Sequence, residues 1–188
     1  MSLIKNTSYY TLGSILPKIG AFIFLPIYLK YLSPTDYGIV ASLQVLNAVF
    51  VVLFTLSMPR ALYRIYYDYT SKNEQRQLIG TVLISVLVLA LVFITIIFLM
   101  HKQVQKIYVS IPFYPYYAYA IAAVFFQALH IIPTIFLQIK ERAATFIKVG
   151  VSLFFVKSLI VLLLIVGYSR GARGYLEAEL IAAIIFLP

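Results

Sequence analysis

The sequence predicts an all-α integral membrane protein, built as a polytopic bundle of helices. Hydrophobic residues make up 63% of the 188-residue chain and charged residues only 11%, whereas a soluble domain has about half apolar and about a quarter charged residues. The apolar residues form continuous blocks, unlike the alternating ten-residue strands of a membrane barrel. Because backbone groups in lipid must be satisfied within a helix or a closed barrel, these blocks predict membrane-spanning helices.

Five blocks are long enough to cross a bilayer. Each has about 20 residues, which at a rise of 1.5 Å per residue matches a hydrocarbon core of about 30 Å. They cover residues 9–29, 37–58, 78–100, 116–137 and 149–168.

A sixth block begins near Tyr175 and runs to Pro188, but its uncharged part, Leu180–Pro188, is too short to span. We therefore expect residues 1–188 to be one transmembrane unit that is truncated in its sixth helix and belongs to a longer protein.

The cations indicate how the chain is oriented. Positive-inside bias places the side with more lysine and arginine in the cytoplasm, which predicts a multi-pass protein with a cytoplasmic N-terminus. Because the cations lie mostly between apolar blocks, the net charge of +9 predicts contact with anionic lipids, and no nucleic-acid partner is expected. The richer side collects Lys5, Arg60, Arg64, Lys72, Arg76, Lys140, Arg142 and Lys148, and the other Lys30, Lys102, Lys106, Arg170 and Arg173.

The longest polar loop, residues 59–77, reads PRALYRIYYDYTSKNEQRQ. Arg60, Arg64 and Asp68 recur every four residues, which predicts a short amphipathic helix on the cytoplasmic surface. Its arginines either anchor the topology or guide an anionic lipid head group into the protein.

Residue types that support catalysis are sparse. The chain has no cysteine and only two histidines, so no disulfide framework, thiolate site or histidine metal site is expected. No paired-carboxylate cluster, nucleophile elbow or phosphate loop is present. The sequence therefore predicts a protein that is not an enzyme and that needs no cofactor or metal.

Lys18 and Lys157 lie near the middle of the first and fifth blocks. A charged side chain at the centre of a membrane helix costs about 2.5–3.5 kcal/mol on insertion scales. No acidic residue lies deep in the five full blocks, and Glu177 and Glu179 are expected in water on the outer side. Two unpaired cations at similar depth predict an anion-binding site, although each lysine could instead snorkel or meet a backbone carbonyl.

Polar stripes mark two further blocks. Gln127, His130 and Thr134 share one helical face of the fourth block, and Gln44 and Asn47 lie on a stripe of the second. Such stripes turn inward, where they either line a cavity or hydrogen-bond to neighbouring helices. His130 could also titrate near neutral pH and couple transport to protons.

The first block carries Pro17 and Pro26, with Gly13 and Gly20 nearby. Each proline removes a backbone hydrogen bond and clashes with the preceding turn, which predicts a bent helix. The bend is either a static kink or part of a moving cavity wall.

Several segments resemble one family of membrane proteins. The N-terminal segment NTSYYTLGSILPKIGAFIFLPIYLKYLSPTDYGIV resembles the start of polysaccharide flippases, the Wzx-like branch of the multidrug/oligosaccharidyl-lipid/polysaccharide (MOP) superfamily. PRALYRIYYDY followed by QLIGTVL is similar to the first cytoplasmic loop of that family. GARGYLEAELIA is similar to its turn between the fifth and sixth helices. The resemblance implies two lobes with about twelve to fourteen helices.

The resemblance implies that this chain is most of the N-terminal lobe, with a C-terminal lobe as its missing partner. It implies flipping of undecaprenyl-diphosphate-linked oligosaccharides, such as O-antigen repeat units for lipopolysaccharide, across the bacterial cytoplasmic membrane by alternating access. The cationic central cavity of the family agrees with Lys18 and Lys157.

Three alternatives stay open at this stage. A multidrug or cation antiporter of the same superfamily commonly uses buried carboxylates, which the five full blocks lack. A membrane-embedded polysaccharide polymerase or glycosyltransferase needs clustered acidic or arginine residues in large outer loops, and the loops here are small. A non-transporting assembly component is the third.

Overall fold

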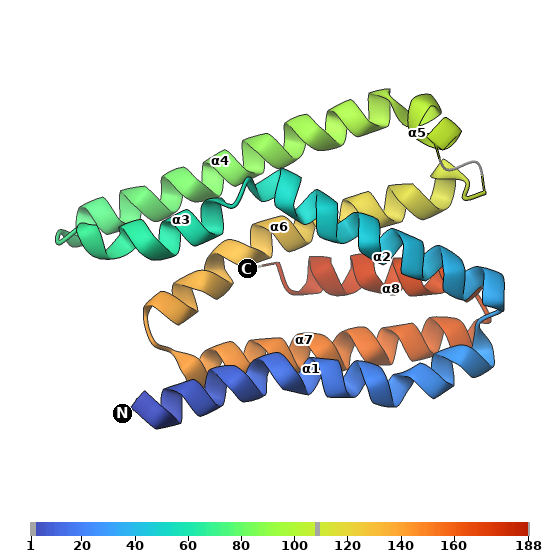
Figure 1. Ribbon diagram of the computed structural model, residues 1–188, viewed down its shortest axis with the longest axis horizontal. Coiled ribbons are helices and arrows are strands. Elements are labelled where there is room, and N and C mark those ends of the chain that lie inside the picture. The colour runs from blue at the N-terminus through green and yellow to red at the C-terminus, as the bar shows by residue number, and fades with distance from the viewer. Residues whose placement is uncertain (1–2, 108–109, 188) are drawn as a thin grey trace.

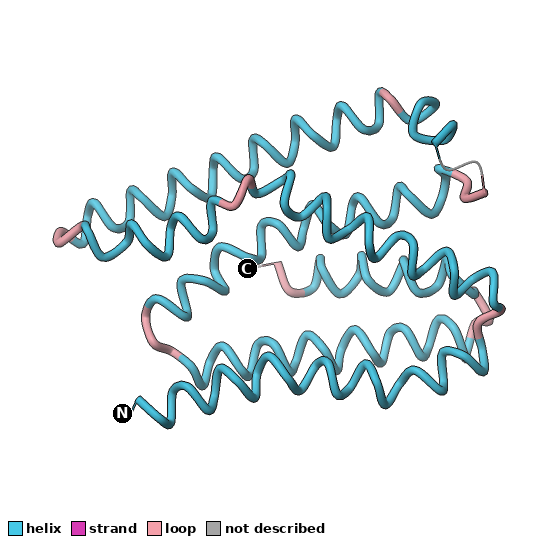
Figure 2. Tube along the Cα trace, in the orientation of Figure 1, coloured by secondary structure: helices cyan, strands magenta, loops and turns pink. Residues whose placement is uncertain are grey.

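The computed structural model describes residues 3–107 and 110–187 and confirms the predicted all-α fold, with only helices and turns in these residues. The bundle is elongated, and its long helices run roughly along one axis (Figures 1 and 2). The α-helices are α1 (Leu3–Tyr31), α2 (Pro34–Thr55), α3 (Met58–Ile65), α4 (Lys72–Leu99), α5 (His101–Ile107), α6 (Ala118–Ile139), α7 (Ala143–Leu162) and α8 (Gly171–Ile185). Shorter helical turns are η1 (Tyr66–Asp68), η2 (Phe113–Tyr117) and η3 (Leu163–Gly167).

Four helical stretches are long and apolar enough to cross a membrane, judged by length and composition. They are Pro34–Thr55, Lys72–Leu99, Phe113–Ile139 and Ala143–Gly167. The first predicted block lies within α1, which runs unbroken through both of its prolines. The sixth helix, α8, begins at Gly171, ahead of the start near Tyr175 that the sequence suggested.

The segment between the second and third long helices contains the predicted amphipathic helix, α3. Pro59 and Leu62 are buried, whereas Arg60 and Arg64 are exposed. The helix ends at Ile65 and passes into η1, so Asp68 does not continue its face. The short helix α5 was not predicted.

The pair α1 and α7 lies along one side of the bundle, and α3 and α4 lie along the other (Figure 1). Helix α8 lies between them and packs against α6, α7 and α2. In Figure 1 one end holds the turns after α1, α4 and α7, and the opposite end holds the turns after α3 and α6. We call the first of these ends the α1–α2 end.

Helices α1 and α7 run side by side in the same direction. A Cβ added at Gly13 would meet Ile147, and one added at Gly20 would overlap the ring of Phe154. Both pairs are offset by 134 residues, so the two helices keep one register along this contact. Small residues allow such close approach of membrane helices.

A hydrogen-bonded clasp closes the α1–α2 end of the bundle. Asp36 Oδ1 accepts a 3.0 Å hydrogen bond from the backbone N–H of Ala172, at the start of α8. Ser33 Oγ donates to Asp36 Oδ2 at 2.6 Å and caps α2 by accepting from the Asp36 N–H. Because a carboxylate satisfies free N–H groups at a helix N-terminus, the clasp lets α8 begin at Gly171.

Gly171 is the residue of this clasp that tolerates least change. Its φ of +56° lies in the left-handed region, and a Cβ there would stand 3.0 Å from both carboxylate oxygens of Asp36. A left-handed conformation costs an L-residue about 1–2 kcal/mol. The glycine therefore permits both the turn and the close approach of Asp36.

We predict that Gly171→Ala lowers the free energy of unfolding by about 1–2 kcal/mol, because alanine, unlike glycine, is strained in the left-handed conformation. Unfolding in SDS, followed by far-ultraviolet circular dichroism, measures this change. Gly38→Ala is the matched control, since Gly38 lies within α2 and has open space around it. Equal stability of both variants would contradict the role of the clasp.

Candidate functional site

Lys157 of α7 forms an ion pair with Glu179 of α8. Lys157 Nζ lies 2.6 Å from Glu179 Oε1, and the Glu179 side chain is 8% exposed. The expectation that Lys157 is unpaired and that Glu179 stands in water is therefore wrong. A lysine in the membrane interior is costly unless it is paired, and α8 supplies Glu179 as the partner of Lys157.

The pairing follows from the hairpin that α7 and α8 form. The chain reverses near Tyr168, and Lys157 and Glu179 are each eleven residues from that turn. In two antiparallel helices joined by a turn, residues that are equally far from the turn lie at the same level. This symmetry was the signal in the sequence that could have found the pair.

Aromatic and amide groups of α8, α2 and α1 lie around the pair. Lys157 Nζ lies 5.5 Å from the centroid of the Tyr175 ring, and Gln44 Nε2 donates a 2.7 Å hydrogen bond to the Tyr175 hydroxyl. The ring of Tyr28 meets the Tyr175 ring edge-on, with centroids 5.8 Å apart. Helices α1, α2, α7 and α8 thus each contribute one or more side chains to this cluster.

A cavity of about 190 Å³ adjoins the cluster, between α1, α2 and α8. Its polar lining comes from three tyrosines and one glutamine, and the rest is aliphatic. The lining residues are Ala21, Leu25, Tyr28, Leu32, Tyr37, Val40, Ala41, Gln44 and Tyr175. A cavity-lining role was predicted for Gln44, whereas none was predicted for the tyrosines.

Lys18 lies on the face of α1 that borders this cavity. It precedes the lining residues Ala21 and Leu25 by three and seven positions, which is one helical face. Lys18 is exposed and forms no ion pair within the described part of the chain. The α1–α7 register places Lys157 level with residue 23 of α1. Lys18 and Lys157 therefore differ in depth by five residues, about 7–8 Å, whereas they were expected at similar depth.

One oxygen of the cluster, and one on the neighbouring helix α2, lack a partner. Among the described residues, Glu179 Oε2 and Asn47 Oδ1 are buried without a hydrogen bond. Asn47 is buried in α2 and is not among the residues that line the cavity that Gln44 borders. A buried carboxylate oxygen without a partner leaves room for a further donor beside Lys157.

The predicted stripe on α6 belongs to another part of the bundle. Thr134 Oγ1 donates to the backbone oxygen of His130 at 2.9 Å. Both residues line a pocket of about 400 Å³ beside the end of α8, which shares no lining residue with the cavity beside Lys157. His130 Nδ1 is buried without a partner in the described residues. Gln127 borders neither of these two cavities.

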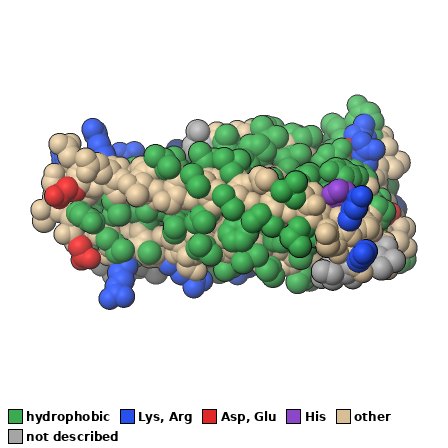
Figure 3. All heavy atoms as spheres, turned by 90° about the horizontal axis from the view of Figure 1, so that it is seen from above, with side chains coloured by type: hydrophobic (Ala, Val, Ile, Leu, Met, Phe, Trp, Pro, Cys, Tyr) green, Lys and Arg blue, Asp and Glu red, His purple; other side chains and the backbone are tan. Residues whose placement is uncertain are grey.

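Arg60 and Arg64 also lie apart from Lys157, on the exposed side of α3. The Tyr67 hydroxyl donates to the backbone oxygen of Ile139, and Lys140 Nζ lies 5.0 Å from the centroid of the Tyr66 ring. These contacts join the α3 segment to the end of α6. Figure 3 shows one face of the molecule, where Lys and Arg gather mainly toward the two ends of the long axis.

Glu177 is buried as well, contrary to the expectation that it meets water. Arg170 Nη1 and Arg173 Nε bind its two carboxylate oxygens at 2.6 and 2.7 Å. Arg173 also reaches the Tyr119 hydroxyl at 3.5 Å. Glu177 therefore ties the first turns of α8 together at the α1–α2 end and leaves Glu179 as the carboxylate beside the cavity.

The arrangement offers groups that can bind a polar ligand. It combines a partly buried lysine and its carboxylate counter-ion with tyrosine rings that can stack on a sugar and an amide that can hydrogen-bond to it. Within the described residues, no group of three His, Cys, Asp or Glu side chains is placed to hold a metal ion.

Comparison with known families places this geometry in context. The family model described as "Polysaccharide biosynthesis protein" matches residues 3–187. The comparisons with curated proteins and with solved structures gave no match. Because the family model covers nearly the whole chain, from α1 to the end of α8, the chain belongs to the polysaccharide biosynthesis protein family.

Proposed function

We propose that this chain is the N-terminal lobe of a flippase that moves lipid-linked oligosaccharides across the bacterial cytoplasmic membrane, with its N-terminus in the cytoplasm. The observation that carries the proposal is the Lys157–Glu179 pair, whose carboxylate is buried and whose lysine contacts Tyr175, a residue that lines the cavity. The family match supports a role in polysaccharide biosynthesis.

The ion pair offers a way to hold an anionic substrate without leaving a bare charge in its absence. When the cavity is empty, Glu179 is the counter-ion of Lys157. A diphosphate or acidic sugar that enters the cavity competes with Glu179 for the ammonium group. Because removing one partner of a buried pair costs about 3–5 kcal/mol, the carboxylate keeps the empty site folded.

The other groups of the site suit the remaining parts of such a substrate. Tyr28, Tyr37 and Tyr175 line the cavity together with Gln44, so aromatic rings and an amide border the space for a sugar. Lys18 is exposed on the face of α1 that borders the cavity, and it supplies a second cation on the side away from the α1–α2 end. The lipid tail stays in the bilayer, and a C-terminal lobe closes the opposite wall as the two lobes rock between inward-open and outward-open states.

A cation or multidrug antiporter remains the second candidate, and Glu179 is the observation that favours it. The five full apolar blocks lack a deep carboxylate, whereas the buried Glu179 lies in α8, the sixth. Its unpartnered Oε2 could accept a proton or a cationic substrate.

We predict that Lys157→Ala in the full-length protein lowers export of the lipid-linked glycan by about tenfold or more, since it removes a charge-assisted contact worth about 1.5–3 kcal/mol. Lys18→Ala is expected to lower export severalfold without a change in stability, because no carboxylate loses its ion-pair partner. Surface polysaccharide, measured at equal expression, provides the readout. Lys148→Ala is the control, since Lys148 is exposed on the same helix as Lys157.

The double variant Lys157→Ala/Glu179→Ala separates folding from binding. It removes both charges, so it is expected to be more stable than Lys157→Ala alone and still to export poorly. Restoration of export by the double variant would refute the anion-binding role of Lys157.

Glu179→Gln distinguishes the two candidate functions. As a counter-ion that competes with the substrate, Glu179 is not required for glycan binding. The flippase proposal therefore predicts that Glu179→Gln is less stable but keeps its glycan export per folded molecule. The antiporter proposal predicts proton-driven efflux of a cationic dye that Glu179→Gln abolishes. Dye efflux in membrane vesicles and surface polysaccharide in cells measure the two activities side by side.

A further inference from the structure

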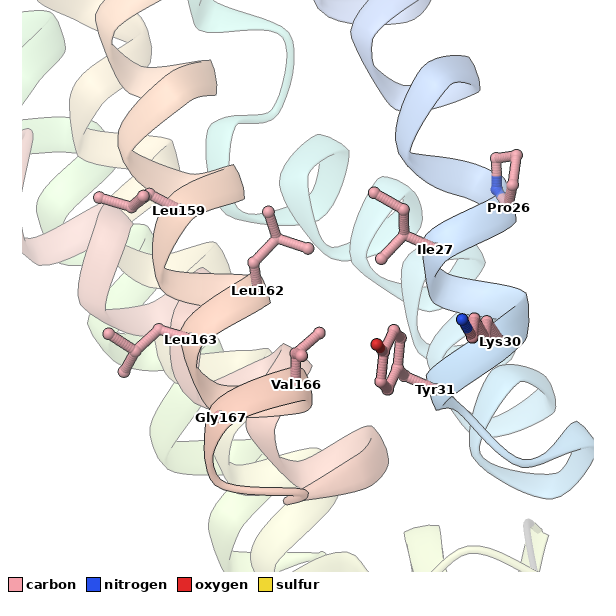
Figure 4. Close-up of a pocket in the computed structure, with 9 residues that line it drawn as sticks. All are labelled: Pro26, Ile27, Lys30, Tyr31, Leu159, Leu162, Leu163, Val166 and Gly167. Atoms are coloured by element: carbon pink, nitrogen blue, oxygen red, sulfur yellow. The ribbon is translucent and has the colours of Figure 1, made fainter.

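A second hollow lies between α1 and α7, away from the cavity beside Lys157. It has a volume of about 680 Å³, and the two hollows share no lining residue. Figure 4 shows its walls, with α1 on one side and α7 with η3 on the other. The walls are formed by Pro26, Ile27, Lys30, Tyr31, Leu159, Leu162, Leu163, Val166 and Gly167. We call this hollow the α1–α7 groove.

The groove exists because the two helices pack closely only along their first halves. Gly13 and Gly20 admit α7 side chains against the backbone of α1. Beyond them, Pro26 lacks a backbone N–H, which favours a bend away from a straight path. On the other wall, α7 loosens into the wider helical turn η3, which ends at Gly167 without a side chain to fill the space.

The surroundings of the groove identify the kind of molecule that fills it. Leu159 and Leu163 are 67% and 53% exposed, so in a membrane-spanning bundle this wall faces lipid. One end of the groove reaches the last turn of α1 and Gly167, the end of the membrane-spanning stretch Ala143–Gly167, where we expect lipid head groups to begin. An occupant of this position must be apolar along the helices and polar at the α1–α2 end.

A free cation stands at that polar end. Lys30 is exposed, its Nζ lies 5.7 Å from the centroid of the Tyr31 ring, and it forms no ion pair in the described residues. The nearby arginines Arg170 and Arg173 are already bound to Glu177. The carbonyl end of α1 attracts Lys30, but an exposed helix end leaves the ammonium open to a second, anionic partner.

We propose that the α1–α7 groove binds one anionic phospholipid of the surrounding leaflet. Its acyl chain lies along Ile27, Leu159 and Leu163, and its phosphate meets Lys30 and Tyr31. Lipid tails are as apolar as leucine, so the walls fix where the lipid lies but give no preference among head groups. The selectivity comes from Lys30, and one lysine near a membrane surface predicts about fivefold preference for an anionic over a zwitterionic lipid.

Native mass spectrometry of the 188-residue chain, released from nanodiscs of equal phosphatidylglycerol and phosphatidylcholine with matched acyl chains, tests the proposal. We expect phosphatidylglycerol to be retained about fivefold over phosphatidylcholine. Lys30→Gln is expected to bring the two lipids to parity, and Lys30→Arg to keep the preference. Lys102→Gln, an exposed lysine of α5 at the same end, is the matched control and should change nothing.

A substitution in the apolar wall supplies an independent readout. Leu163→Trp fills the groove and is expected to reduce retention of both lipids, with far-ultraviolet circular dichroism confirming that the helices persist. The proposal is overturned if the preference survives Lys30→Gln, or if Lys102→Gln abolishes it equally. Displacement of phosphatidylglycerol by an equimolar polyprenyl phosphate would also overturn it, because the groove would then belong to a different lipid. None of these outcomes depends on the proposed flippase activity.

Discussion

The ion pair between Lys157 and Glu179 constrains the rest of this structure. A single charge within an apolar bundle is costly, and an opposite charge at the same level of a helical hairpin offsets part of that cost. The pair fixes which face of α8 meets α7. It thereby also places Tyr175, one turn earlier on α8, against Gln44 of α2 and Tyr28 of α1.

The α1–α2 end of α8 is held by a second set of polar contacts. Asp36 caps its first turn, and two arginines bind Glu177. With the Lys157–Glu179 pair to α7 deeper in the bundle and the Asp36 contact to α2 at its first turn, α8 is held at two levels. The tyrosine-lined cavity lies between α1, α2 and α8.

Much of the fold could be predicted from the sequence because lipid imposes simple rules. Continuous apolar blocks are sufficient to predict spanning helices, and the spacing of Arg60 and Arg64 predicted α3. The site was less accessible, because it depends on how helices meet. Gln44 borders the cavity as expected, but Asn47, three residues further, turns into the buried interior.

The pairing of Lys157 with Glu179 was missed for a definite reason. No acidic residue lies deep in the five full apolar blocks, and Glu179 was expected in water at the outer side of the sixth. Only the equal distances from the turn at Tyr168 bring the two residues together. The depths of Lys18 and Lys157 were misjudged similarly, because the register between α1 and α7 is set by Gly13 and Gly20 rather than by the block boundaries.

A charge-reversal cycle on this pair tests the account most directly. The variants Lys157→Glu, Glu179→Lys and the double exchange would be compared by their SDS midpoints of unfolding in the same micelles. The account predicts that each single variant is strongly destabilised and that the double exchange recovers most of the loss, because the opposite charges meet again. A double exchange as unstable as the sum of the single variants would show that Lys157 and Glu179 do not hold α7 and α8 together.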